Sequence, residues 1–277
     1  MISAAFRRLK HRRRTARALA ELSRPAPQPR PHGLPAPLVV SLTSYCARFA
    51  TLKPTLQSIL RQDVRPDAVV LWLAEDDLPK LPADIPALPG LQVRACPDLR
   101  SYKKIVPSLH HYPDAYIVTA DDDVFYPQGW LAGLVDAARD GARVACNRAH
   151  RIAMAGPETP APYDRWSHNI DAPETGPQVF LTGVSGVIYA PGALHPDALR
   201  ADLFTDLAPS SDDVWLYWMH RMNGVEARKI GGRQRILEWE GSQDSCLRQA
   251  NTQSGSGNDR AIAAMIARYG WPGGVED

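Results

Sequence analysis

Three segments of the chain share one order, in which a short apolar run leads through a loop toward a helical pattern. The apolar runs are Leu38–Leu42, Ala68–Leu73 and Ala115–Ala120. Short apolar runs of this kind are typical of strands buried on both faces of a sheet. Parallel neighbours in a sheet need a long crossover, usually a helix. The order therefore predicts an α/β fold with a mostly parallel sheet flanked by helices.

The length and composition favour one folded domain behind an extension. The chain has 277 residues, 44% of them hydrophobic and 22% charged, which is typical of a globular protein with one large core. Prolines are frequent in Pro25–Pro37, where regular helix is excluded and a linker or an extended lead-in is expected. We therefore expect a basic and proline-rich N-terminal extension over residues 1–37 and a single domain over residues 38–277.

The N-terminal extension concentrates positive charge, although the whole chain has a formal net charge of only +2. Its first 30 residues contain one acid, Glu21, and nine basic residues: Arg7, Arg8, Lys10, Arg12, Arg13, Arg14, Arg17, Arg24 and Arg30. Apolar residues between them permit a basic helix over Met1–Leu22 that lies on an anionic membrane. A solvated basic tail is an equally good interpretation.

Other features of the sequence bear on the compartment and on partners. Four widely spaced cysteines form no CxxC pair, which argues against a zinc knuckle and predicts reduced structural thiols. No apolar run approaches the ~20 residues of a membrane-spanning helix, and no secretory signal pattern is present. We expect a cytoplasmic protein, with peripheral contact at the inner face of the cell membrane as the open alternative. Beyond the extension, no clustered basic pattern points to nucleic acid.

The second half of the chain has weaker patterns. Glycines inside the apolar run Val179–Ala190 suggest a strand or bend, either where a ligand approaches the backbone or where packing is tight. Asp213–Met222 is expected to be an aromatic helix with its tryptophans mostly in the core. Arg235–Trp239 is expected to be a late strand, and Asp259–Tyr269 a closing helix.

Three consecutive aspartates, Asp121, Asp122 and Asp123, directly follow the third apolar run. Like charges in such a cluster raise one another's pKa unless a cation compensates them. Carboxylate oxygens suit Mg²⁺ or Mn²⁺, which can also hold diphosphate oxygens and stabilise a departing diphosphate. An acidic surface turn that caps the next helix is the alternative. The preceding strand favours a binding site, because open α/β sheets bind ligands at the carboxyl ends of their strands.

Five segments of the chain follow one another with characteristic spacing: Val39–Tyr45, Leu71–Asp76, Ser101–Lys104, Val118–Val124 and Ser211–Trp215. Together they resemble the landmarks of family-2-like bacterial glycosyltransferases with the GT-A fold, over about residues 38–269. The resemblance implies transfer of a sugar from a nucleotide-diphosphate sugar to a glycan or lipid-linked acceptor. It also implies Mn²⁺ or Mg²⁺ as the cofactor and inversion at the sugar.

The resemblance assigns the nucleoside to the first loop and to the acid after the second strand. On this chain those positions are Thr43, Tyr45 and Asp76. Glu75 and Asp77 flank Asp76, so the choice among the three acids stays open.

The resemblance also assigns the metal and the diphosphate. Asp121 and Asp123 would hold them, with Asp122 facing the ribose or the sugar. Lys104 and Arg48 are candidates to neutralise diphosphate charge as cations. A solvated lysine and a surface arginine are the respective alternatives.

Inverting transfer needs a base that takes the proton of the acceptor hydroxyl. The family places that base in an acidic pair that opens a helix, which matches Asp212 and Asp213 after Ser211. A helix N-terminus stabilises carboxylates, and simple N-capping is the alternative role. We select Asp213 as the base and keep Asp212 as the other candidate.

Two other functions use some of the same features. A metal-dependent nucleotidyltransferase or phosphohydrolase could act on a nucleotide-sugar-like substrate through the same aspartates. Such enzymes would be expected to carry a glycine-rich basic loop after the first strand or additional histidines near the acids, and the sequence shows neither. A nucleic-acid-binding module would depend on the arginine-rich start alone.

Overall fold

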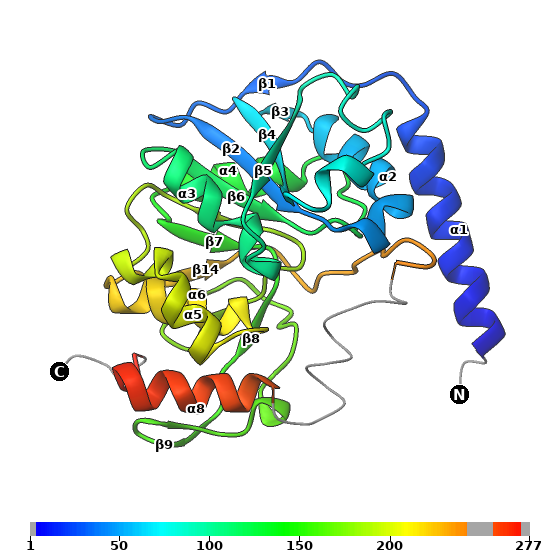
Figure 1. Ribbon diagram of the computed structural model, residues 1–277. Helices are drawn as coiled ribbons and strands as arrows, with labels where there is room; N and C mark the ends of the chain where they lie inside the picture. The colour runs from blue at the N-terminus through cyan, green and yellow to red at the C-terminus, as the bar shows by residue number, and fades with distance from the viewer. Residues whose placement is uncertain (1–3, 243–256, 273–277) are drawn as a thin grey trace.

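A computed structural model describes residues 4–242 and 257–272. Its centre is an eight-stranded sheet in the order β11-β14-β7-β13-β6-β2-β4-β5 (Figure 1). The strands of this sheet are β2 (Leu38–Thr43), β4 (Ala68–Ala74), β5 (Leu91–Cys96), β6 (Tyr116–Ala120), β7 (Val144–Cys146), β11 (Glu174–Gly176), β13 (Val187–Tyr189) and β14 (Ala227–Lys229). The three predicted apolar strands are therefore neighbours at the middle of one sheet.

One half of the sheet is parallel, and this half positions the site. Strands β5, β4, β2 and β6 run in the same direction, so their carboxyl ends meet at one edge. Beyond β6 the sheet is mixed, because β13 runs antiparallel to both β6 and β7. The α/β class with a mostly parallel sheet is confirmed.

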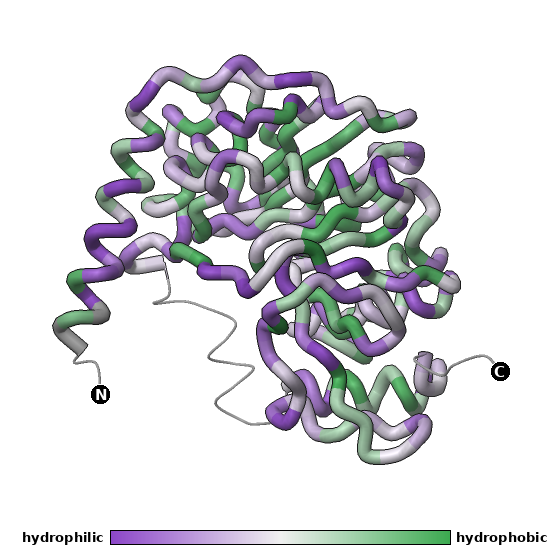
Figure 2. Tube along the Cα trace, turned by 180° about the vertical axis from the view of Figure 1, so that it is seen from behind, coloured by the Kyte–Doolittle hydropathy of each residue, from purple (hydrophilic) through white to green (hydrophobic). Residues whose placement is uncertain are grey.

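Helices cover both faces of the sheet. Val40 and Leu42 of β2 pack with α2 (Phe49–Leu60) and α4 (Trp130–Arg139) on one face. Val39, which precedes Val40, packs on the other face beside Trp72. Because successive strand residues point to opposite faces, one apolar run serves both layers. Figure 2 shows hydrophobic stretches concentrated in the interior of the chain trace.

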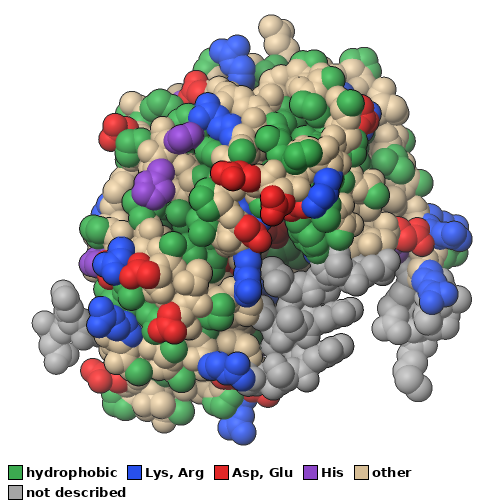
Figure 3. All heavy atoms as spheres, viewed as in Figure 1, with side chains coloured by type: hydrophobic (Ala, Val, Ile, Leu, Met, Phe, Trp, Pro, Cys, Tyr) green, Lys and Arg blue, Asp and Glu red, His purple; other side chains and the backbone are tan. Residues whose placement is uncertain are grey.

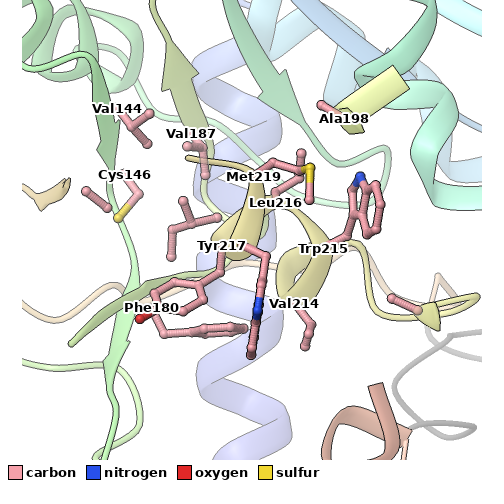
Figure 4. Packing of buried hydrophobic residues seen from close by; sticks show 14 of the residues in the cluster. Val144, Cys146, Phe180, Val187, Ala198, Val214, Trp215, Leu216, Tyr217 and Met219 are labelled. Carbon is pink, nitrogen blue, oxygen red and sulfur yellow. The ribbon is translucent and has the colours of Figure 1, made fainter. Parts of the chain in front are cut away.

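The face opposite α2 and α4 carries most of the second half of the chain. Its helices are α3 (Val106–His111), α5 (Ala201–Leu207), α6 (Asp212–Met222) and α8 (Gly257–Tyr269). Short antiparallel pairs accompany them: β8 (Ala149–Arg151) with β12 (Val179–Leu181), and β9 (Met154–Gly156) with β10 (Thr159–Pro160). Figure 4 shows Tyr217 and Met219 of α6 near the strand residues Phe180 and Val187, with Trp215 on the side of Ala198. Trp215 and Trp218 are fully buried, as expected of core tryptophans.

The N-terminal extension is helical and packs against the domain. Helix α1 (Ala4–Leu22) lies beside α2, and β1 (Arg30–Pro31) pairs in parallel with β3 (Val64–Arg65) (Figure 1). The proline-rich stretch thus contains a short extended strand of a two-stranded sheet, as an extended lead-in allows. None of the helices in the described part of the chain is long and apolar enough to cross a membrane.

The expected strand over Arg235–Trp239 is wrong. This segment makes one isolated antiparallel bridge, between Glu238 and Val124, and two flanking backbone hydrogen bonds. Phe125 N–H donates to Leu237 O, and Trp239 N–H donates to Asp123 O. The segment pairs with the loop that leaves β6, so it has no long partner strand, and it lies directly against the acid triplet.

The described cysteines carry free thiols, in agreement with the expectation for Cys46, Cys96 and Cys146. Cys246 lies outside the described residues.

Candidate functional site

The acid triplet leaves β6 beside the end of β2, where Leu42 pairs with Ala120. Asp122 Oδ2 accepts a hydrogen bond from Ser44 Oγ at 2.6 Å. Arg48 Nη1 lies 3.0 Å from Asp122 Oδ1 and 2.5 Å from Asp123 Oδ2. The Arg48 side chain is only 10% exposed, so it belongs to the site rather than to the open surface.

The 3₁₀ helix η1 (Cys46–Arg48) brings Arg48 to the acids. Burial raises the pKa of Asp122, although Arg48 and the Ser44 hydroxyl oppose that shift. Burial and the neighbouring Asp121 charge raise the pKa of Asp123 to about 6. The triplet therefore retains repulsion that a further cation would relieve.

Lys104 joins the triplet to a distant part of the chain. Its Nζ lies 3.4 Å from Asp121 Oδ1 and 2.8 Å from Asp212 Oδ2. Burial alone would lower the pKa of Lys104, but the charges of Asp212 and Asp121 raise it well above its usual value. Lys104 ends η3 (Arg100–Lys104), and its carbonyl accepts a hydrogen bond from buried Ser41 Oγ at 2.6 Å. It is a buried bridging cation, not a solvated lysine.

The acid pair opens α6 as expected, and Asp213 faces a glycine. Asp213 Oδ1 accepts the Gly183 N–H at 2.8 Å. Burial and the charge of Asp212 raise the pKa of Asp213 to about 7. A Cβ on Gly183 would lie 2.8 Å from Lys104 Nζ and 3.1 Å from Asp213 Oδ1, so a larger residue there would displace the Lys104 ammonium group.

The second glycine of this turn serves packing. Gly186 has φ +90°, and a Cβ there would lie 2.6 Å from Trp130 Cζ2. Trp130 Nε1 donates to Ser185 O at 2.7 Å and fixes the turn on α4. The packing alternative thus accounts for Gly186, whereas Gly183 makes room for side chains of the site.

The residues expected to hold a nucleoside lie at or after the ends of β2 and β4, the two strands that follow β6 in the sheet order, and they differ in the contacts that they make. Thr43 Oγ1 donates to Trp72 O at 2.8 Å, at the ends of β2 and β4. The Tyr45 ring lies 5.8 Å from the Arg48 guanidinium carbon. Asp76 is exposed in the turn after β4, and none of the hydrogen bonds or ion pairs within the described residues joins it to the triplet.

The excess of acidic over basic side chains in the site is relevant to whether it can bind a metal ion. Five carboxyl groups surround two basic side chains, namely Asp121, Asp122, Asp123, Asp212 and Asp213 around Arg48 and Lys104. Within residues 4–242 and 257–272, no three His, Cys, Asp or Glu side chains form a metal-binding group. Mg²⁺ is usually held by one or two carboxylates together with substrate phosphates and waters. Asp121, 24% exposed, and Asp123 fit that smaller donor set.

Two contacts of the site were not expected from the sequence. Ser44 holds Asp122, and Tyr126 Oη accepts the Asp121 N–H at 2.7 Å. Ser44 stands inside the Thr43-Ser44-Tyr45 motif, which is the signal that could have identified it. Tyr126 follows the triplet without a periodic pattern that marks it. Figure 3, viewed as in Figure 1, shows acidic side chains near the centre of the visible face, with Lys and Arg side chains beside them.

No protein-family model matches the sequence, and no curated protein matches it. Among solved structures, the chain is similar to a crystal structure of GalNAc-T7 with UDP, GalNAc and Mn²⁺. The identity is 12% and the TM-score 0.47, over 76% of this chain and 46% of that one. The chain therefore spans less than half the length of the structure it matches.

Proposed function

We propose that this protein is a GT-A-type glycosyltransferase that moves a sugar from a nucleotide-diphosphate sugar to a glycan or lipid-linked acceptor. The observation that supports it is the position of Lys104, which contacts both Asp121 after β6 and Asp212 at the start of α6. The acid triplet, which is suited to bind a metal and a diphosphate, thus lies next to the acid pair at the start of α6, which is suited to accept a proton. Sugar transfer from a nucleotide donor needs both within one substrate length.

On the donor side, Asp121 and Asp123 would hold Mn²⁺ or Mg²⁺. When bound, the metal would stabilise the charge that develops on the leaving diphosphate. Arg48 keeps Asp122 and Asp123 in place through its two contacts, so these carboxylates are oriented before substrate arrives. Tyr45 and Thr43, on the same loop, would contact the nucleoside, with Asp76 at the neighbouring strand end.

On the acceptor side, Asp213 would act as the base. Its pKa of about 7 leaves a substantial ionised fraction at neutral pH, and a base with such a pKa still takes a proton effectively. Asp213 would remove the acceptor hydroxyl proton while that oxygen bonds to the anomeric carbon. The bond to the diphosphate breaks on the opposite face, and the sugar configuration inverts. Asp212, paired with Lys104, would position that lysine.

A thermal-shift screen of nucleoside diphosphates, each with and without Mn²⁺, tests the proposal. A ligand that binds the folded chain raises its melting temperature by mass action, so one nucleoside diphosphate should raise it only when Mn²⁺ is present. The same nucleotide as a sugar conjugate should then support transfer to a glycan acceptor. A chain that none of the nucleotides stabilises would contradict the proposal. Release of inorganic phosphate or pyrophosphate instead of nucleoside diphosphate would favour the phosphohydrolase or nucleotidyltransferase alternative.

A further inference from the structure

Helix α1 has one face that docks on the domain. Ala18 is 3% exposed and packs with Leu237 and Trp239. Arg14 Nη2 donates to the carbonyls of Arg235 and Ile236, at 2.7 and 3.2 Å. These contacts hold the helix along one edge of the molecule, with its N-terminal end directed away from the sheet (Figure 1).

The solvent-exposed side of α1 carries apolar side chains. Leu9 is 48% exposed, Leu19 is 49% exposed and Phe6 is 56% exposed. Leu9 precedes the docked Ala18 by about two and a half helical turns, which places the two on opposite sides of the helix. Among the described residues, just one other large hydrophobic side chain is exposed, Leu78 at 38%. Exposed apolar side chains that gather on one helix mark an interaction surface.

Basic residues surround these apolar side chains. The exposed basic residues of α1 are Arg8, Lys10, Arg12, Arg13 and Arg17. No Asp or Glu occurs between Ala4 and Ala20. Long basic side chains beside exposed apolar side chains on one helix are typical of helices that lie in the interface of an anionic bilayer. Nucleic acid would bind through the basic side chains alone, and Leu9 and Leu19 would have no apolar partner in such a complex.

We propose that the outward face of α1 binds the surface of a membrane that contains anionic phospholipid. The apolar side chains would enter the boundary between headgroups and acyl chains, and the arginines would contact lipid phosphates. This inference rests on α1 alone and not on the proposed reaction. The docked face would keep the catalytic domain at a fixed orientation to the bilayer.

Vesicle co-sedimentation of the full chain tests this surface. The vesicles contain equal parts of phosphatidylglycerol and phosphatidylcholine, with pure phosphatidylcholine as the reference. Deletion of the extension is a poor test, because α1 and β1 pack on the domain. Point changes at exposed positions are better, and circular dichroism and melting temperature verify that each variant folds. The matched pairs are Arg13→Gln with Arg165→Gln, and Leu9→Gln with Leu78→Gln, since all four side chains are exposed.

The full chain should bind the anionic vesicles and be released by high salt. Each arginine near an anionic surface contributes about fivefold to binding, so Arg13→Gln should weaken it by about that factor and Arg12→Gln/Arg13→Gln by roughly 25-fold. Leu9→Gln should weaken it as well, whereas Arg165→Gln and Leu78→Gln should not. Equal binding by the α1 variants and their controls would overturn the proposal. Binding to an RNA or DNA oligonucleotide that is insensitive to Leu9→Gln, without vesicle binding, would assign the face to nucleic acid instead.

Discussion

The Nζ of Lys104 lies 2.8 Å from Oδ2 of Asp212, although one residue ends a 3₁₀ turn in the first half of the chain and the other opens a helix in the second. The same Nζ approaches Asp121, so this lysine connects the two acidic groups of the site. Its removal would leave buried carboxylates without their compensating charge.

Lys104→Met should therefore destabilise the fold strongly. Loss of one member of a buried ion pair costs about 3–5 kcal/mol, because the remaining charge is left uncompensated. Urea unfolding measures the difference. Lys53→Met is the control, since Lys53 forms a pair of similar length with Asp84 at the surface, where both side chains are more than 40% exposed. That change should cost much less stability, because solvent screens an exposed ion pair, and equal losses in the two variants would contradict the bridging role of Lys104.

Asp213→Asn should abolish most sugar transfer while donor and metal binding remain. The amide can still accept the Gly183 N–H, but it takes no proton, so turnover should fall by roughly 10²- to 10⁴-fold. The wild-type rate should rise with pH and level off above about pH 7, because the base must be ionised. The variant should lack that rise.

The stability of Asp213→Asn shows whether its loss of activity comes from the missing base or from a structural defect. The pKa of Asp213 is raised in the folded state, so the folded chain binds more protons than the unfolded chain between about pH 4 and 7. Ionisation of Asp213 thus destabilises the fold as pH rises through that range, and Asp213→Asn should be at least as stable as wild type at pH 8. Asp212→Asn is the companion variant. If it alone loses transfer while Asp213→Asn stays active, the base is Asp212.

Asp123→Asn should lose metal-dependent nucleotide binding. A neutral amide is a poor ligand for Mg²⁺ or Mn²⁺, and removal of even an indirect partner of a metal costs about 10- to 100-fold in affinity. Calorimetric titration with nucleoside diphosphate and Mn²⁺ measures the loss. Asp114→Asn changes an exposed acid shortly before β6 and should bind as wild type does. Unchanged, metal-dependent affinity in Asp123→Asn would remove this residue from the donor site.

His220→Asn should make stability less sensitive to acid. Burial lowers the pKa of His220 to about 4, and its Nδ1 lies 2.7 Å from Val225 O. Between about pH 4 and 6.5 the unfolded chain binds a proton at this histidine that the folded chain does not, so stability falls as pH falls through that window. Near pH 4 the effect approaches about 3 kcal/mol. Denaturant unfolding across this range should show a slope reduced by about one proton in the variant, whose amide can keep the bond to Val225 O.

Periodicity and chemistry in the sequence predicted much of the parallel half of the fold. Buried runs such as Leu38–Leu42 have little freedom, because such residues must pack on both faces and parallel strands need crossovers. The same logic placed Asp121–Asp123 at the carboxyl end of a parallel strand and began the aromatic helix at Asp213, one residue after its observed start, since strand ends and helix termini are local features. It failed at Arg235–Trp239, where the pairing partner is a loop and not a strand.

The tertiary structure alone decided which charges meet. Nothing local to Arg48 or Lys104 distinguishes a surface cation from a buried one, because the difference depends on which carboxylates the folded chain brings within 3 Å or so of each. Helix α1 shows the same difference between what the sequence determines and what the tertiary structure decides. The sequence determined that its residues are basic and apolar, whereas the packing of Ala18 on Leu237 and Trp239 decided which of them face outward. Composition and periodicity are properties of neighbours along the chain, and long-range contacts are not.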